Sequence, residues 1–256
     1  MIVSLLVGLP LAQADENPLE HALRATFRIG NGTSSGTAFI VAVPSDVNDP
    51  APRTVLITAA HVLEGFGNGD CTVVMRKEAD DGLYVSHSVA VPLRRDDQLL
   101  WVRHPEQDVA AVPFDLPGDV DCQPFELRQV IDADAVKSGK LRVGQQVYIP
   151  CYPAKLSANE AGWPVLRGGT IASYPLAPVS QVPTLMVDYS NFGGDSGAPV
   201  VSLSDGEPRV VALAFGMQRQ SDKVTLPFEE RVMHTPLGIS NTLQAQFIRD
   251  TIELLK

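Results

Sequence analysis

Short runs of apolar and β-branched residues, separated by turn residues, make up most of the chain. Such runs are typical of strands. A first block comprises residues 25–29, 36–41, 54–58, 71–75, 84–89 and 109–112. After a polar stretch at 115–140, a second block comprises residues 146–149, 169–172, 184–188, 198–201 and 210–215. The pattern therefore predicts two blocks of strands joined by a linker.

The C-terminal residues follow a different period. Apolar side chains recur at helical spacing at Leu243, Phe247, Ile248, Ile252 and Leu255. Ser240 or Asn241 precedes most of them as a candidate helix cap. We expect an amphipathic helix at about 241–255 that packs on the second block of strands and takes no part in chemistry.

Composition narrows the class of protein. With 45% hydrophobic and 20% charged residues, the 256-residue chain is predicted to be globular. Its 20 glycines and 20 prolines favour many turns between short strands over a helical bundle. The formal net charge of −10 argues against nucleic acid or an anionic membrane as the main partner.

Residues 1–14 carry no charge and end in Ala12-Gln13-Ala14, a small-x-small pattern typical of signal-peptide cleavage. This segment predicts a secreted or periplasmic protein whose mature chain begins at Asp15. Because the segment is short and lacks a basic start, a buried terminal strand is the alternative. No other apolar run approaches the roughly 20 residues that a membrane-spanning helix needs.

A histidine follows the third predicted strand in Thr58-Ala59-Ala60-His61. A single histidine beside a strand is more often structural than catalytic. Helical zinc binding is excluded because no second histidine lies four residues further on. Taken alone, His61 is a weak indication of a site.

A serine stands among glycines at residues 193–199, which read G-G-D-S-G-A-P. A serine that transfers acyl groups needs backbone N–H groups aimed at the developing oxyanion, and a neighbouring side chain would obstruct them. Gly194 and Ser196 are the candidate donors of this oxyanion hole. The alternative is an ordinary glycine-rich hairpin turn.

Together and in this order, T-A-A-H and G-D-S-G resemble the chymotrypsin/trypsin-like serine peptidases, in particular the bacterial trypsin-like type. The resemblance implies an aspartate between the two motifs. Asp108 precedes an apolar run and is similar to the family's Asp-x-Ala-x-apolar segment. The chain order His61, Asp108, Ser196 is that of this family rather than of subtilisins or α/β-hydrolases.

The resemblance extends from about residue 25 to 255 and implies an all-β fold of two antiparallel six-stranded β-barrels with a C-terminal α-helix. A single peptidase domain is then expected at 15–256. Its N-terminal barrel, at about 20–125, would supply His61 and Asp108. Its C-terminal barrel, at about 140–235, would supply Ser196.

The resemblance also implies the chemistry. Ser196 attacks a peptide carbonyl, His61 takes its proton and later gives it to the leaving amine, and Asp108 orients the imidazole. We therefore expect a serine endopeptidase that forms an acyl-enzyme and uses no metal or cofactor, acts on a peptide or protein and is monomeric. The alternatives are a catalytically silent or latent binding protein of this fold and an esterase with the same triad.

By the same analogy, Ser190 lies at the base of the specificity pocket, and Ala214, Phe215 and Gly216 lie along one wall. The strand through Ala214–Gly216 would also pair with the substrate backbone. Because no acid stands at the pocket base, we expect a preference for a medium-sized apolar side chain rather than for Arg or Lys.

The chain departs from the family pattern in two respects. It has no liberated Ile-Val-Gly-Gly amine to pair with Asp195, and the similar residues 28–32 lie too close to the next strand, so the partner of Asp195 is open. It also lacks the cysteines that flank the histidine in many secreted relatives. Of its three cysteines, Cys71 and Cys122 could form a disulfide, which would leave Cys151 as a buried thiol.

Overall fold

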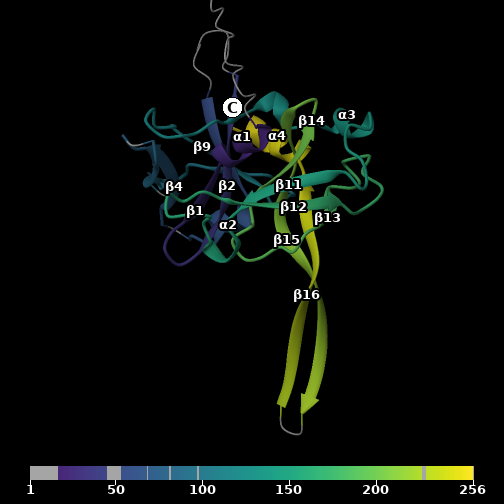
Figure 1. Ribbon diagram of the computed structural model, residues 1–256. Coiled ribbons are helices and arrows are strands. Elements are labelled where there is room, and N and C mark those ends of the chain that lie inside the picture. The colour runs from purple at the N-terminus through teal and green to yellow at the C-terminus, as the bar shows by residue number, and fades with distance from the viewer. Residues whose placement is uncertain are drawn as a thin grey trace, which may run out of the picture.

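The strands of this protein form two large sheets and one small hairpin, as the computed structural model in Figure 1 shows. The structure describes residues 17–44, 53–67, 69–80, 82–96, 98–226 and 229–255. The predicted signal peptide, residues 1–14, lies outside the described residues. The two predicted blocks of strands correspond to the two large sheets.

The first sheet has eight strands in the order β5-β4-β1-β2-β3-β9-β8, with β10 paired to β2. Its strands are β1 (Thr26–Gly30), β2 (Ser35–Val43), β3 (Arg53–Thr58), β4 (Cys71–Glu78), β5 (Tyr84–Val91), β8 (Val102–Arg103), β9 (Ala110–Pro113) and β10 (Phe125–Glu126). All pairings are antiparallel except that of β10 with β2.

This sheet does not close, so the prediction of an N-terminal six-stranded barrel is not confirmed. The chain between the edge strands β5 and β8 turns into the separate hairpin of β6 (Arg94–Arg95) and β7 (Gln98–Leu99). The edge strand β8 is only two residues long and pairs with β9 alone among the described strands.

The second sheet is a closed six-stranded barrel, as predicted, in the order β11-β12-β13-β16-β15-β14. Its strands are β11 (Gln146–Cys151), β12 (Val165–Ile171), β13 (Thr184–Asp188), β14 (Pro199–Ser204), β15 (Glu207–Leu226) and β16 (Glu229–Gln244). Every neighbouring pair is antiparallel.

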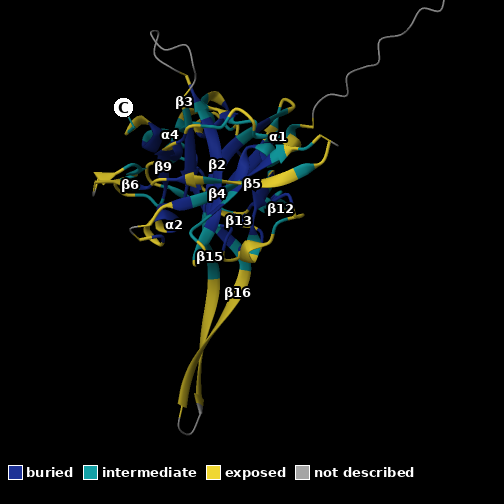
Figure 2. Cartoon of the chain, turned by 90° about the vertical axis from the view of Figure 1, so that its left-hand side faces the viewer, coloured by how far each residue is buried: buried dark blue, intermediate teal, exposed yellow. Residues whose placement is uncertain are grey.

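Two strands of the barrel are much longer than the others and project from it as a two-stranded arm, residues 217–226 and 229–238 (Figures 1 and 2). The sequence predicts only residues 210–215 of β15 and nothing of β16. Both faces of the arm are exposed toward its end, so its residues lack the polar-apolar alternation of a half-buried strand.

The helical segments are short. They are α1 (Pro18–Arg24), α2 (Ala60–Glu64), η1 (Leu127–Gln129), α3 (Ala133–Lys137), η2 (Pro153–Lys155) and α4 (Gln246–Glu253). Helix α4 begins later than the predicted 241, with Ala245 rather than Ser240 or Asn241 at its N-cap. Leu243 belongs to β16, because its backbone pairs with Leu213 of β15 and Thr184 of β13. No described helix has the length and apolar character to cross a membrane.

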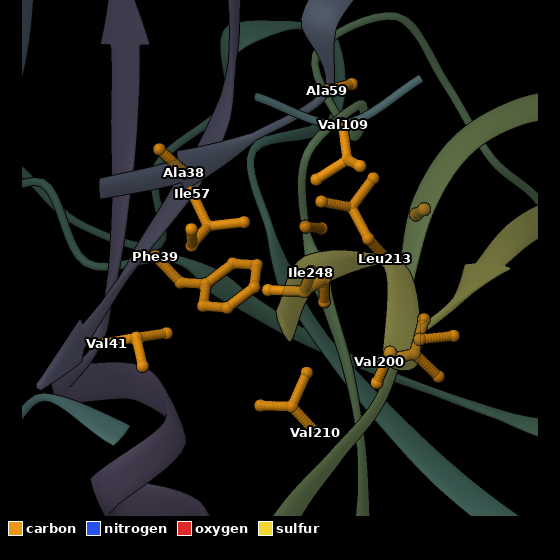
Figure 3. Close-up of a cluster of buried hydrophobic side chains, with 14 of the residues drawn as sticks. Ala38, Phe39, Val41, Ile57, Ala59, Val109, Val200, Val210, Leu213 and Ile248 are labelled. Carbon is orange, nitrogen blue, oxygen red and sulfur yellow. The ribbon is translucent and has the colours of Figure 1, made fainter. Parts of the chain in front are cut away.

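One hydrophobic core runs through both sheets and the C-terminal helix. Side chains from β2, β15 and α4, among them Phe39, Leu213 and Ile248, gather in the same cluster (Figure 3). Phe39, Leu213 and Ile248 are all fully buried. Because the cluster is shared, the two halves are expected to unfold together.

The three cysteines are free thiols, so the disulfide considered between Cys71 and Cys122 is absent. Cys71 Sγ donates instead to Val91 O at 3.7 Å within the β4–β5 pair. Burial is the main cause that raises the pKa of Cys71 and that of Cys122 to about 12. These thiols are therefore protonated and unreactive near neutral pH.

Replacing Ile248 by Ala should destabilise the protein by about 2–5 kcal/mol, because it removes buried methylenes at the junction of α4 with both sheets. Urea denaturation followed by fluorescence measures the loss, and a single transition is expected. Glu253→Ala, on the exposed side of the same helix, is the matched control and should change stability by less than about 0.5 kcal/mol. Two separate transitions would contradict the shared core.

Candidate active site

His61 and Asp108 lie in contact. His61 is in α2, just after β3, and Asp108 is in the turn before β9, the strand paired with β3. His61 Nδ1 lies 2.5 Å from Asp108 Oδ2, and the backbone N–H of His61 donates to Asp108 Oδ1 at 2.9 Å. An ionised carboxylate only accepts hydrogen bonds, so Nδ1 carries the proton and Nε2 carries the free lone pair.

The ionisation of Asp108 follows from its surroundings. Burial raises the pKa of this carboxyl, but the hydrogen bonds and charge of His61, together with the charge of Arg103, lower it by more. The pKa of Asp108 therefore lies below its ordinary value, and the carboxylate is charged at neutral pH.

A tight turn precedes Ser196. Asp195 N–H donates to Phe192 O at 3.0 Å, and Gly194 has a φ of +103° at the third position of the turn. This combination defines a type II turn, which requires glycine at that position. A Cβ on Gly194 would also overlap Tyr152 O, so the glycine is needed for space as well as for its backbone conformation.

This turn orients one backbone amide outward. Gly193 O accepts a hydrogen bond of 2.7 Å from the N–H of Ala154. Because C=O and N–H point in opposite directions across a trans peptide, the N–H of Gly194 points away from Ala154. Among the residues that the structure describes, neither this amide nor that of Ser196 has an acceptor. Both N–H groups are free to bind an oxyanion.

Thr37, a fully buried residue of β2, fastens this turn to the first sheet. Its hydroxyl donates to Gly194 O at 2.7 Å and accepts from the N–H of Tyr152 at 3.3 Å. Its own N–H donates to Ser196 O at 2.9 Å. One side chain and one amide of the first sheet thus hold the serine turn of the second.

Gly197 brings the same turn against the strand that leads to His61. Its φ is +91°, and a Cβ there would overlap Thr37 O and the hydroxyl of Thr58. Thr58 ends β3, three residues before His61. A residue with a side chain therefore does not fit at position 197, where the serine turn meets β2 and the end of β3.

Gly36 lies close both to the serine turn and to α2, the helix that carries His61. A Cβ on Gly36 would meet the side chain of Val62, which follows His61, at 2.8 Å and Ser196 O at 3.0 Å. No hydrogen bond joins Ser196 Oγ to His61 Nε2 among the described residues. The structure thus brings His61 and Asp108 into contact and places the backbone of Ser196 near Gly36 and the side chain of Val62, the neighbour of His61 in α2.

Asp195 has a cationic partner in Arg167 of β12. The carboxylate is fully buried, accepts the N–H of Phe192 at 3.0 Å and lies 3.4 Å from Arg167 Nη1. The guanidinium also lies over the rings of Tyr189 and Phe192. Burial raises the pKa of Asp195, and the Phe192 amide, the Cys151 thiol and, last, the Arg167 charge oppose that rise. Arg167 is thus the cationic partner of Asp195 among the described residues.

The predicted substrate strand is attached to the serine turn. Ala214 O accepts the N–H of Gly197 at 2.7 Å, and the N–H of Ala214 donates to Ala198 O at 2.9 Å. Ala214 is fully buried, and Phe215 is partly exposed. The strand continues beyond them toward the arm.

Gly216, another predicted specificity residue, accepts hydrogen bonds from two side chains. Gly216 O accepts from Asn191 Nδ2 at 3.2 Å and from Ser240 Oγ at 3.0 Å, and Asn191 Nδ2 also donates to Ser240 Oγ at 2.9 Å. Ser190 is exposed, with Oγ 3.6 Å from where a Cβ on Gly238 would lie. Asn191 therefore connects the segment after Ser190 to β15 and β16.

Sequence reasoning missed four residues of this region: Thr37, Arg167, Asn191 and Ser240. Thr37 lies in a predicted strand, and Ser240 is a candidate helix cap in the sequence. Each of the four acts through a partner distant in the sequence, so no local pattern marks its role. Among the described residues, no group of three or more His, Cys, Asp or Glu could hold a metal ion.

Comparison with known proteins identifies the family. The family model of the trypsin-like peptidase domain matches residues 36–213, which is most of the chain and contains His61, Asp108 and Ser196. The chain belongs to the trypsin-like peptidase domain family. No curated protein matches the sequence.

Two solved structures of a mycobacterial protease are similar to this trypsin-like chain. The first is Rv3671c from M. tuberculosis H37Rv in an inactive form with a serine-to-alanine mutation, at 17% identity, 97% coverage of this chain, 95% of that chain and a TM-score of 0.49. The second is the Rv3671c protease in its inactive form, at 17% identity, 93% coverage of each chain and a TM-score of 0.48.

Thr37→Val should destabilise the trypsin-like fold, because it keeps the side-chain shape but leaves Gly194 O and the Tyr152 amide without this partner. The expected cost is about 1–3 kcal/mol for each buried group left unpaired. Urea denaturation measures it. Thr37→Ser keeps the hydroxyl and is the matched control. Equal stability of the Val and Ser variants would contradict a joint made by the hydroxyl.

Arg167→Met should destabilise the protein by about 3–5 kcal/mol at neutral pH, because it leaves the buried Asp195 carboxylate without its cation. The pKa of Asp195 already lies above its ordinary 3.8, and losing Arg167 should raise it further. Ionisation then opposes folding, so the variant should lose stability as pH rises from about 3.8 and regain it as pH falls.

Urea denaturation at several pH values tests this dependence on Arg167. The double variant Arg167→Met, Asp195→Asn carries no buried charge and should recover most of the loss at neutral pH. A single Arg167→Met variant that is as stable as the wild type at neutral pH would contradict the pairing.

Proposed function

We propose that this protein is a serine endopeptidase in which Ser196, His61 and Asp108 form the catalytic triad. Ser196 Oγ adds to the peptide carbonyl while its proton passes to His61 Nε2. The C–N bond then breaks, and the leaving amine takes that proton from His61. Water, deprotonated by His61, hydrolyses the acyl-enzyme and restores the Ser196 hydroxyl. Asp108 keeps the imidazole in the required tautomer and stabilises its charged form.

The proposal is supported by two features of the described residues: the amides of Gly194 and Ser196 have no acceptor there, and His61 is held by an ionised Asp108. Paired donors of this kind stabilise the negative charge that develops on a carbonyl oxygen. The triad side chains and these amides supply a nucleophile, a base and an oxyanion site, so the proposed chemistry needs no cofactor.

For specificity, we propose that the substrate residue before the cut is uncharged and of small to medium size. Ser190, Ala214, Phe215 and Gly216 carry no charge that would select Arg, Lys or Glu. The Asn191 side chain lies between the segment after Ser190 and Gly216 O, which limits the space for a long side chain. We also propose a secreted or periplasmic, monomeric enzyme, in line with the apolar residues 1–14.

A fluorophosphonate probe tests the nucleophile. The chain and its Ser196→Ala variant are incubated with the probe, and labelled protein is identified by mass spectrometry. Because only an activated serine adds to the phosphorus centre, the wild type should be labelled at Ser196 and the variant should not. A peptide library read by mass spectrometry then reports the cleaved bonds.

Asp108→Asn tests the triad separately from the serine. The amide cannot hold His61 in the required tautomer, so labelling should slow by about three to four orders of magnitude while the fold is kept. Absence of wild-type labelling across neutral pH would overturn the enzyme proposal in favour of a silent binding protein. Labelling with hydrolysis of esters but not of peptides would identify an esterase.

A further inference from the structure

The arm, residues 217–226 and 229–238, grows out of the strand predicted to bind substrate. Within the barrel, β15 has β16 on one edge and β14 on the other. Its pairing with β14 ends at Leu213, followed by the hydrogen bonds of Ala214 to the serine turn. Its pairing with β16 continues to Leu226. From Phe215 onward, one edge of β15 therefore lacks a partner strand among the described residues.

This free edge starts at the candidate nucleophile. Ser196 lies three residues before β14, and the adjacent Gly197 bonds to Ala214 O. An extended chain laid on β15 beyond Ala214 would take the place that β14 leaves and would meet Ser196 at one end. Residues 219–225 of this edge strand are all exposed, so nothing in the described chain covers it (Figure 2).

The opposite edge of the arm is less able to take a strand. Along β16, β13 pairs as far as Ile239, and Pro236 stands three residues further out. Proline has no N–H, so it cannot donate to an added strand and is a common protection of exposed edges. Residues 217–226 of β15 contain no proline. The asymmetry leaves the edge that leads to Ser196 as the open one.

Among the described residues, no third strand pairs with the arm to stabilise it. A two-stranded ribbon is marginal in water, and a third strand adds main-chain hydrogen bonds. Here the ribbon is held by its ladder and by exposed side-chain pairs such as Lys223–Glu230 and Ser221–His234. Two register shifts at its root, after Ala214 and after Met217, bend β15 and direct the arm outward.

We propose that the arm is an extended substrate-binding surface: a substrate segment pairs antiparallel with the free edge of β15 from Met217 to Leu226. This inference rests on the proposed peptidase function. A strand antiparallel to β15 runs toward Ser196, so the residues on the arm are those that precede the cleaved bond. At about 3.4 Å per residue, this edge accepts about ten residues.

The geometry selects a class of substrate. A folded loop cannot present about ten extended residues before the cleaved bond, whereas a disordered tail, a linker or an unfolded chain can. Backbone pairing provides affinity with little dependence on sequence. The preferred substrates are therefore proteins with a long extended segment on the acyl side of the cut.

Peptide binding to the Ser196→Ala variant tests the arm without requiring turnover. Two fluorescein-labelled peptides of alternating Thr and Ser end in Ala: one has about fourteen residues, and the other only the last four or so. Fluorescence anisotropy should show about tenfold or greater tighter binding of the long peptide. Methylating alternate backbone nitrogens of its arm-binding half removes donors and should abolish that advantage without any change in the protein.

A shortened arm is the complementary variant. Residues 222–233 are replaced by Asn-Gly, which closes the hairpin after the Ser221–His234 pair and leaves the barrel ladder intact. In the Ser196→Ala background, this variant should bind both peptides with the weak affinity of the short one. An unchanged urea transition midpoint verifies that the barrel is still folded.

The outcomes separate the two proposals. Equal binding of long, methylated and short peptides would overturn the role of the arm, whatever the catalytic result. Loss of a dimer on shortening the arm, seen by light scattering and without a change in peptide binding, would overturn it in favour of a second copy as the partner. Arm-dependent binding together with no Ser196 labelling would keep the binding surface and overturn the endopeptidase.

Discussion

The hydrogen bonds of Thr37 are the joint on which the candidate site depends. The serine turn belongs to the barrel, whereas His61 and Asp108 belong to the open sheet, and Thr37 links the two through Gly194 O, Ser196 O and the Tyr152 amide. The joint is fully buried, so water does not compete for these groups. The position of Ser196 relative to His61 is therefore set by inter-sheet contacts rather than by either sheet alone.

Two glycines and a buried carboxylate also constrain the serine turn. Gly194 and Gly197 both adopt positive φ and both stand where a Cβ would overlap a neighbouring oxygen. Beneath them, the Asp195 carboxylate is buried against Arg167. Removing Arg167 alone would leave the Asp195 carboxylate unpaired in a low-dielectric interior, so the pairing with Arg167 favours this arrangement of the turn. Because Arg167 is part of the barrel, this restriction is built into the folded chain.

The arm adds a different kind of feature to the same site. The backbone pairing of β15 with β16 continues from the barrel into the arm. The outer residues of the arm are exposed on both faces, so the arm has no hydrophobic core of its own. Its position follows from β15, which passes from the buried core at Leu213 through the substrate strand to the exposed ribbon without a break. The strand that contacts the turn of the proposed nucleophile is therefore the strand that carries the proposed binding edge.

The sequence by itself determined the two blocks of strands, the C-terminal helix and the family. The strands and the helix can be predicted because burial of one face imposes a local period on the sequence. The family can be predicted because T-A-A-H and G-D-S-G are each contiguous in the sequence. Only the tertiary structure decided the rest. It showed that the first sheet stays open, that β16 extends through the predicted helix start, and that Arg167 meets Asp195. Each of these depends on backbone or charge contacts between distant segments, and such contacts leave no period or spacing in a single sequence.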